Sequence, residues 1–339
     1  MIRKLIYISL SLFLFVFAKK TNFNSVVFLE YPEYWPKPIY NFSKTPLEKD
    51  KIELGRKLFY DPILSLDGTI SCSSCHLSYT AFTHVDHSVS HGIGDSIGTR
   101  NSPVLINLAW NKSFMWDGAI NNIEVQALAP VEHPGEMGET ILNVINKLQV
   151  SKNYPQLFYK AYDDSIITGQ LFLKALSQFQ LSLVSANSKY DKVIAGEDKF
   201  TVQEQNGYQL FKQNCATCHS EPLFTNGEFE NNGLPVNSIY NDYGRVGVTL
   251  NPIDSLKFKV PTLRNIEFSF PYMHDGRFES LSEVLSHYNN GIQNNKTLSK
   301  DININLNLSN NEQVDIIAFL LTLTDKEFLF NPEFSYSRN

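Results

Sequence analysis

The sequence has little positive charge and few cysteines. Lysine and arginine together number 29 against 35 acidic residues, so the net charge is −6 at pH 7. Nucleic-acid-binding proteins concentrate lysine and arginine to displace counterions from phosphates, and this charge balance argues against nucleic acid as a partner. The chain also lacks a disulfide framework, because all four cysteines fall in two copies of one short motif.

Long hydrophobic runs are absent except at the N-terminus. There, Arg3 and Lys4 precede an apolar run from Leu5 to Phe17, and Ala18 follows as a small residue at a cleavage point. This pattern predicts a signal peptide at residues 1–18 that is removed on export to the periplasm. A retained membrane anchor is the alternative, although the run is short for a spanning helix.

Evenly spaced, alternating strand patterns are also missing, and the apolar residues follow helical steps instead. One predicted helix carries Leu171, Ala175, Leu176, Phe179 and Leu183. A second carries Val314, Ile317, Ala318 and Leu321. Asn310 is a competent N-cap for this second helix, with Gln313 three residues later as in a capping box. We therefore predict an all-α fold with long irregular loops, such as residues 86–102 and 225–247.

The cysteines form two C-x-x-C-H motifs. These are Cys72-Ser-Ser-Cys75-His76 and Cys215-Ala-Thr-Cys218-His219. In such a motif the two thiols add to haem vinyl groups, and the histidine binds the iron. A lone C-x-x-C can be half of a zinc site, but thiolates from both halves of the chain would then have to converge. Two complete motifs predict two covalent haem c groups, with His76 and His219 as proximal ligands.

The two motifs divide the chain into similar halves. Gly55-Arg-Lys-Leu58-Phe59 precedes the first motif, and Gly207-Tyr-Gln-Leu210-Phe211 precedes the second. This repeat beside two identical motifs indicates a duplicated domain. We predict two cytochrome c-type domains, each around one covalent haem, at residues 45–200 and 201–330.

Several stretches resemble the bacterial dihaem cytochrome c peroxidases and the related MauG-type enzymes. They are Ser90-His-Gly92, Arg100-Asn-Ser-Pro103, Phe114-Met-Trp-Asp-Gly118, Glu124-Val-Gln126, Glu136-Met137, Lys259-Val-Pro-Thr-Leu-Arg-Asn265 and Pro271-Tyr-Met-His-Asp-Gly276. They occur in the family's order, from about residue 45 to the C-terminal helix. The resemblance implies that the N-terminal haem reacts with peroxide and that the C-terminal haem receives electrons.

The resemblance also implies roles for individual residues. Glu136 matches the distal acid–base residue and Gln126 its polar neighbour; heterolytic cleavage of an O–O bond needs a carboxylate that moves a proton between the two oxygens. Trp116 matches the tryptophan between the haems, although it also suits a core aromatic position. Read without the family, Glu136 would be a surface acid in a loop. His274 is predicted to bond a haem propionate or the neighbouring loop.

A calcium site at the domain interface is a further implication. It would consist of Asn101 with the backbone oxygens of Ser269 and Pro271. An oxygen-only site of this kind suits a hard cation.

Two positions depart from the peroxidase branch. Ile93 stands where that branch has a histidine that blocks the peroxide haem, and His91 reaches this position only through a slip in the alignment. We therefore predict a five-coordinate N-terminal haem that needs no reductive activation; His84 and His87 are interpreted as loop residues. A smaller departure is Ala119, where the family usually has arginine.

The second departure concerns the C-terminal haem. Tyr288 stands where the peroxidase branch has the methionine ligand, as in the MauG branch. Tyrosinate lowers the iron potential, whereas methionine raises it. His287 and Met273 remain alternative ligands.

The predicted reaction is reduction of hydrogen peroxide to water, with electrons from a small soluble cytochrome c or a copper protein. Two alternatives stay open: MauG-like oxidation of residues on another protein, and plain electron transfer by a dihaem cytochrome without catalysis. A homodimer is also possible.

Overall fold

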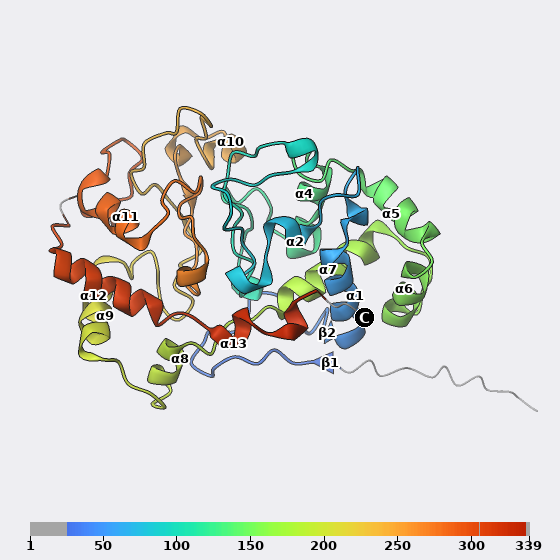
Figure 1. Cartoon of the computed structure of the whole chain (residues 1–339), viewed down its shortest axis with the longest axis horizontal. Coiled ribbons are helices and arrows are strands. Elements are labelled where there is room, and N and C mark those ends of the chain that lie inside the picture. Colours follow the sequence, from blue (N-terminus) through green and yellow to red (C-terminus); the bar gives the residue numbers. More distant parts are fainter. Residues whose placement is uncertain (1–25, 305, 337–339) are drawn as a thin grey trace, which may run out of the picture.

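The computed structural model describes residues 26–304 and 306–336, and its helices form two domains that lie side by side (Figure 1). The first part of the chain contains α1 (Lys49–Tyr60), α2 (Cys72–Cys75), α3 (Ile123–Gln126), α4 (Leu128–Glu132), α5 (Ile141–Val150), α6 (Tyr154–Tyr162) and α7 (Gly169–Ser182). The rest contains α8 (Lys189–Ile194), α9 (Val202–Asn214), α10 (Val246–Thr249), α11 (Leu281–Ser286), the π-helix η7 (His287–Gly291), α12 (Asn310–Leu321) and α13 (Lys326–Leu329).

Strands within the described residues are only two residues long. β1 (Val26–Val27) pairs with β2 (Leu47–Glu48), and β3 (Phe229–Glu230) pairs with β4 (Phe258–Lys259), both antiparallel. Long irregular loops join the helices, so the predicted all-α class is confirmed. No helix in these described ranges has the length and apolar character of a membrane span. The signal peptide predicted for residues 1–18 lies outside them.

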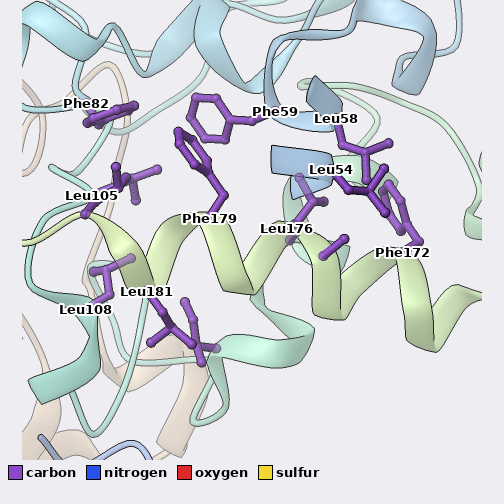
Figure 2. Close-up of a cluster of buried hydrophobic side chains, with 14 of the residues drawn as sticks. Leu54, Leu58, Phe59, Phe82, Leu105, Leu108, Phe172, Leu176, Phe179 and Leu181 are labelled. Carbon is purple, nitrogen blue, oxygen red and sulfur yellow. The ribbon is translucent and has the colours of Figure 1, made fainter. Parts of the chain in front are cut away.

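The core of the N-terminal domain lies where α1 crosses α7. Figure 2 shows Phe59 of α1 beside Phe179 of α7, and their ring centroids are 5.2 Å apart. The predicted helix over residues 171–183 is confirmed as α7, whose buried face includes Phe172, Leu176 and Phe179.

The C-terminal domain repeats this crossing with α9 and α12. The predicted cap of α12 was off by one residue: the N-cap is Ser309, not Asn310, and Glu312 rather than Gln313 completes the capping box. The Ser309 hydroxyl accepts from the Glu312 N–H, and the Glu312 carboxylate accepts from the Ser309 N–H. A carboxylate accepts this bond more strongly than an amide does.

The buried face predicted for α12 was also partly wrong. The buried residues are Ile316, Phe319 and Leu320, whereas Val314 is 52% exposed and Leu321 is 40% exposed. Apolar residues occur almost all round this helix, so its periodicity could not select a face. Packing against α9 determines which face of α12 is buried.

Two glycines allow both helix crossings. A Cβ on Gly55 would lie 1.9 Å from the Ala175 carbonyl oxygen, and a Cβ on Gly207 would lie 1.8 Å from that of Asp315. Only glycine permits so close an approach between helix backbones. The sequence repeat that begins at these glycines therefore marks a repeated packing geometry, which supports the predicted duplication.

Replacing either glycine with alanine is expected to destabilise its domain. For Gly55→Ala and Gly207→Ala we expect a loss of about 1–3 kcal/mol, because the added methyl group would force the helices apart. Denaturant unfolding of the holoprotein would measure this. Gly247→Ala is the matched control, since nothing lies within 4 Å of a Cβ there. Equal unfolding midpoints for the control and the crossing variants would contradict the packing argument.

The chain ends cross between the domains. The segment containing α13 runs back to the N-terminal domain (Figure 1), where Phe328 lies 6.1 Å from Phe82 between ring centroids. Fully buried Arg264 donates two hydrogen bonds of 2.8 Å to Asp191 and lies over the ring of Trp35. Truncating one partner of such a buried pair typically costs about 3–5 kcal/mol.

Candidate active site

Both C-x-x-C-H motifs line one cavity of about 740 Å³ at the junction of the domains. The first motif forms α2, which begins at Cys72 and is capped by Ser71. The second begins at Cys215, the C-cap residue of α9. The helix that carries Gly207 thus leads directly to its attachment site, whereas a short turn and loop separate the helix that carries Gly55 from Cys72.

Each motif histidine is held by a backbone carbonyl. Nδ1 of His76 lies 2.6 Å from the Phe82 oxygen, and Nδ1 of His219 lies 3.2 Å from the oxygens of Phe224 and Pro261. A proton on Nδ1 satisfies these carbonyls and leaves Nε2 free to bind iron, as is usual for metal-ligating histidines. Burial lowers the pKa of both imidazoles to about 4, so they are neutral at pH 7.

The cysteines fit haem attachment and not zinc. All four are free thiols that line the cavity, and burial raises the pKa of Cys72 and of Cys215 to about 12. Among residues 26–304 and 306–336, no group of three or more histidine, cysteine or acidic side chains is placed to hold a metal ion. The convergent thiolates that a zinc site would require are therefore not formed there.

Glu136 and Gln126 line the same cavity as His76. Burial raises the pKa of the Glu136 carboxyl, and the charge of nearby His133 opposes this shift. Gln126 lies at the end of α3, and its amide contacts the Met115 sulfur at 3.6 Å. A carboxyl group held away from water, with a raised pKa, is suited to taking up and returning a proton.

Glu136 is held in place by backbone contacts. The sequence did not reveal them. The Glu136 carbonyl accepts a hydrogen bond from the Ile93 N–H at 2.8 Å. A Cβ on Gly92 would lie 2.1 Å from the Gly135 oxygen, so this contact requires glycine. The Ser90-His-Gly92 stretch could have indicated this close approach, because an isolated glycine often marks one.

The three loop histidines differ in whether they line the cavity. His91 lines the cavity, and its carbonyl lies 3.5 Å from the Cys75 sulfur. His84 and His87 are not among the lining residues, and Ile93 is not either. The structure thus brings His91, but not Ile93, to the wall of the cavity.

Trp116 lies at the junction and is fixed by both domains. Its indole N–H donates to the Asn101 oxygen at 2.7 Å, and its carbonyl accepts from the Lys259 N–H at 2.7 Å. Asp117, the next residue, pairs with Arg100 at 2.6 Å. Arg245 also donates to the Asp117 carbonyl, so arginines from elsewhere surround this turn although position 119 is alanine.

The three residues predicted for calcium, Asn101, Ser269 and Pro271, all line the cavity. The Asn101 N–H donates to the His274 carbonyl at 2.7 Å, which joins the two domains. The His274 ring stacks on Phe258 at 3.7 Å between centroids, and burial lowers its pKa to about 4. These contacts fix the His274 ring in the cavity wall, and its bond to a propionate or to the neighbouring loop stays a prediction.

Of the three candidate ligands on the C-terminal side, Tyr288 and Met273 line the cavity and His287 is not among the lining residues. Nε2 of His287 lies 3.1 Å from the Asn232 oxygen. Tyr288 lies in the π-helix η7, an irregularity frequent at functional sites. Burial raises the pKa of its phenol to about 12.

Comparisons with known proteins agree with this geometry. The family model "Di-haem cytochrome c peroxidase" matches residues 49–199, and the "Cytochrome c" model matches residues 204–324. The chain is 33% identical to the methylamine utilization protein MauG of Methylophilus methylotrophus, with 86% of each chain covered. It is 35% identical to the cytochrome c551 peroxidase of Nitrosomonas europaea, over 83% of this chain and 81% of that protein.

Solved structures show the same fold. A MauG-like protein associated with microbial copper homeostasis superimposes with a TM-score of 0.81 at 31% identity, covering 90% of this chain and 98% of that one. The diheme peroxidase BthA from Burkholderia thailandensis has a TM-score of 0.72 at 20% identity, over 83% of this chain and 87% of that one.

Proposed function

The chain belongs to the di-haem cytochrome c peroxidase and MauG family, and we propose that it reduces hydrogen peroxide to water with electrons from a small redox protein. The overall change consumes two electrons and two protons for each peroxide and releases two waters. The donor would be a soluble cytochrome c or a copper protein. The observation that carries the proposal is the half-buried carboxyl of Glu136, which lines the same cavity as His76 and whose pKa burial raises.

Different residues of the chain would bind the haem, transfer the proton and donate a hydrogen bond in this reaction. When bound through His76, the haem supplies an iron that coordinates peroxide and passes electrons to it. A Glu136 oxygen takes the proton from the peroxide oxygen nearer the iron and returns it to the farther one, which leaves as water. The Gln126 amide can donate a hydrogen bond beside it. A plain electron carrier needs neither group.

Electron paramagnetic resonance of the oxidised protein, before and after peroxide, tests this function. We expect one high-spin haem at rest, because Ile93 offers no ligand and the ring of His91 packs against that of His87 at 4.1 Å between centroids. A changed spectrum should follow addition of peroxide. Steady-state turnover with reduced cytochrome c should then be sustained. A ferric protein that is inert to peroxide would identify an electron carrier instead, and two low-spin haems at rest would contradict the open position.

A second candidate is oxidation of residues on another protein. Tyr288 favours it, because the resemblance places tyrosine at this position in the MauG branch, and MauG proteins are among the relatives. Such an enzyme would react with peroxide but turn over poorly with a small donor. The steady-state rate therefore separates the two functions.

Other predictions remain proposals. We retain the domain limits at residues 45–200 and 201–330, the signal peptide at residues 1–18, a periplasmic location and a possible homodimer. The charge balance continues to argue against nucleic acid.

A calcium ion is proposed between Asn101 and the backbone oxygens of Ser269 and Pro271. Treating the holoprotein with a calcium chelator should alter the haem spectrum, because the ion would tie the two domains together. Calcium should restore the spectrum, whereas magnesium should not, since Mg²⁺ is smaller and prefers strict octahedral geometry. An unchanged spectrum after complete removal of calcium would reject the site.

The pH dependence of activity should follow Glu136. Its carboxylate form accepts the peroxide proton, so kcat/KM should rise as pH climbs through its pKa, which burial places above the ordinary value. His133→Gln removes the charge that lowers this pKa, and the acid limb of the profile should move to higher pH. His87→Gln serves as the control, because His87 is exposed and does not perturb Glu136. A limb that stays in place in His133→Gln would contradict the coupling.

A further inference from the structure

Two strongly basic side chains line the cavity, and within the described residues only one of them has acidic partners. Arg100 pairs with Asp117 and with Asp242, both at 2.6 Å. Lys259 forms no ion pair with any residue in the ranges 26–304 and 306–336. The cavity therefore contains one cation whose charge the described protein leaves unbalanced.

The position of Lys259 is fixed by its backbone. It ends β4, where it is paired with Phe229 of β3, and its N–H donates to the Trp116 carbonyl at 2.7 Å. Two residues later, the Pro261 carbonyl contacts Nδ1 of His219. The same short segment thus touches the proximal histidine of one domain and the tryptophan of the other.

The internal repeat allows Lys259 to be compared with the residue at the equivalent position of the other domain. The Lys259 N–H donates to Trp116, and the Asn101 N–H donates to His274, at the same distance of 2.7 Å. Trp116 and His274 occupy equivalent hairpins, since each follows a methionine with positive φ and is spanned by an antiparallel bridge. Asn101 and Lys259 therefore occupy equivalent positions in the two domains. The first has a neutral amide side chain, and the second has an ammonium group.

An unpaired ammonium group in such a place is costly. Burial favours the neutral amine and lowers the pKa of Lys259 to about 8. Buried charges are normally paired or hydrogen-bonded. Each haem brings carboxylates of its own, and these are the anions that a haem-filled cavity gains.

We propose that the Lys259 ammonium group binds a haem propionate at the junction beside Trp116, and that its charge raises the reduction potential of that haem. A nearby positive charge favours the reduced iron, which carries one positive charge fewer than the oxidised iron. The inference rests on haem c being bound and does not depend on peroxide being the substrate.

Spectroelectrochemical titration of the holoprotein, without peroxide, tests this proposal. In Lys259→Gln the ratio of reduced to oxidised iron at a fixed potential should fall about tenfold for one haem, which is about 59 mV for a one-electron couple. Lys259→Arg should restore a potential close to that of the wild type. Lys257→Gln is the matched control, because Lys257 lies two residues earlier and pairs with Asp254 at 3.4 Å.

Haem content must be two per chain in every variant compared. If Lys259→Gln does not assemble, Lys259→Met provides a neutral side chain of similar length for the same measurement. Both potentials unchanged in the neutral variant, or an equal shift in Lys257→Gln, would overturn the proposal. Loss of peroxide turnover with unchanged potentials would also count against it, because the effect predicted is on the potential. Failure of the proposed function alone would leave the potential shift intact.

Discussion

Glu136→Gln is expected to slow peroxide reduction by about 10²- to 10⁴-fold, the range that a positioned general acid–base group contributes. The amide keeps the size of the side chain but cannot take up the peroxide proton. The measurement is kcat/KM for peroxide with a reduced cytochrome c, on protein that carries two haems. Because burial already raises the pKa of Glu136, the wild-type rate should itself fall at acidic pH.

Glu132→Gln is the matched control, since Glu132 lies four residues earlier and is exposed. Its turnover should equal that of the wild type. Glu136→Asp should retain part of the rate, because the carboxylate remains but lies farther from the peroxide. If Glu136→Gln keeps most of its activity, Glu136 is not the acid–base group and the distal assignment is wrong.

Tyr288→Phe is expected to convert the C-terminal haem from low-spin to high-spin and to raise its potential substantially. Tyrosinate is a hard anionic donor that stabilises ferric iron, and axial ligands move haem potentials over about 0.8 V. The phenol pKa of about 12 means that iron binding must displace the proton, as metal binding does for other acidic ligands. Electron paramagnetic resonance and a redox titration would measure both effects.

Two further variants separate the rival ligands. Tyr272→Phe is the control, because Tyr272 also lines the cavity but donates its hydroxyl hydrogen bond to the Ile266 carbonyl at 3.0 Å. Met273→Leu tests the other lining candidate. An unchanged low-spin spectrum in Tyr288→Phe, together with its loss in Met273→Leu, would transfer the ligand role to methionine.

Local chemistry explains why part of the site could be predicted. Haem attachment needs two thiols and a histidine at fixed spacing, so Cys72, Cys75 and His76 could be identified without a fold. The repeat that begins at Gly55 and Gly207 was visible for a similar reason, because one helix crossing imposes the same glycine twice. Glu136 and Gln126 were proposed only through the family resemblance, since an acid in a loop has no local signature.

The errors arose where several local solutions were equally good. Ser309 and Asn310 are both competent N-caps, and the carboxylate of Glu312 decided between them. The buried face of α12 was chosen by its contact with α9. The choice between the neighbours His287 and Tyr288 was not an error: the resemblance favoured Tyr288, and Tyr288 is the one that lines the cavity.

The sequence by itself determined the helical class and indicated the duplication, and it predicted two haems with His76 and His219 as proximal ligands, because each depends on short-range spacing along one segment. Tertiary structure alone decided what meets at the junction: one cavity for both motifs, Trp116 held from both sides, and Lys259 without an acidic partner in the described chain. The shared cavity and the contact between Trp116 and Lys259 join residues more than a hundred positions apart. Their contacts depend on how two folded domains pack, and local sequence patterns carry no information about that packing.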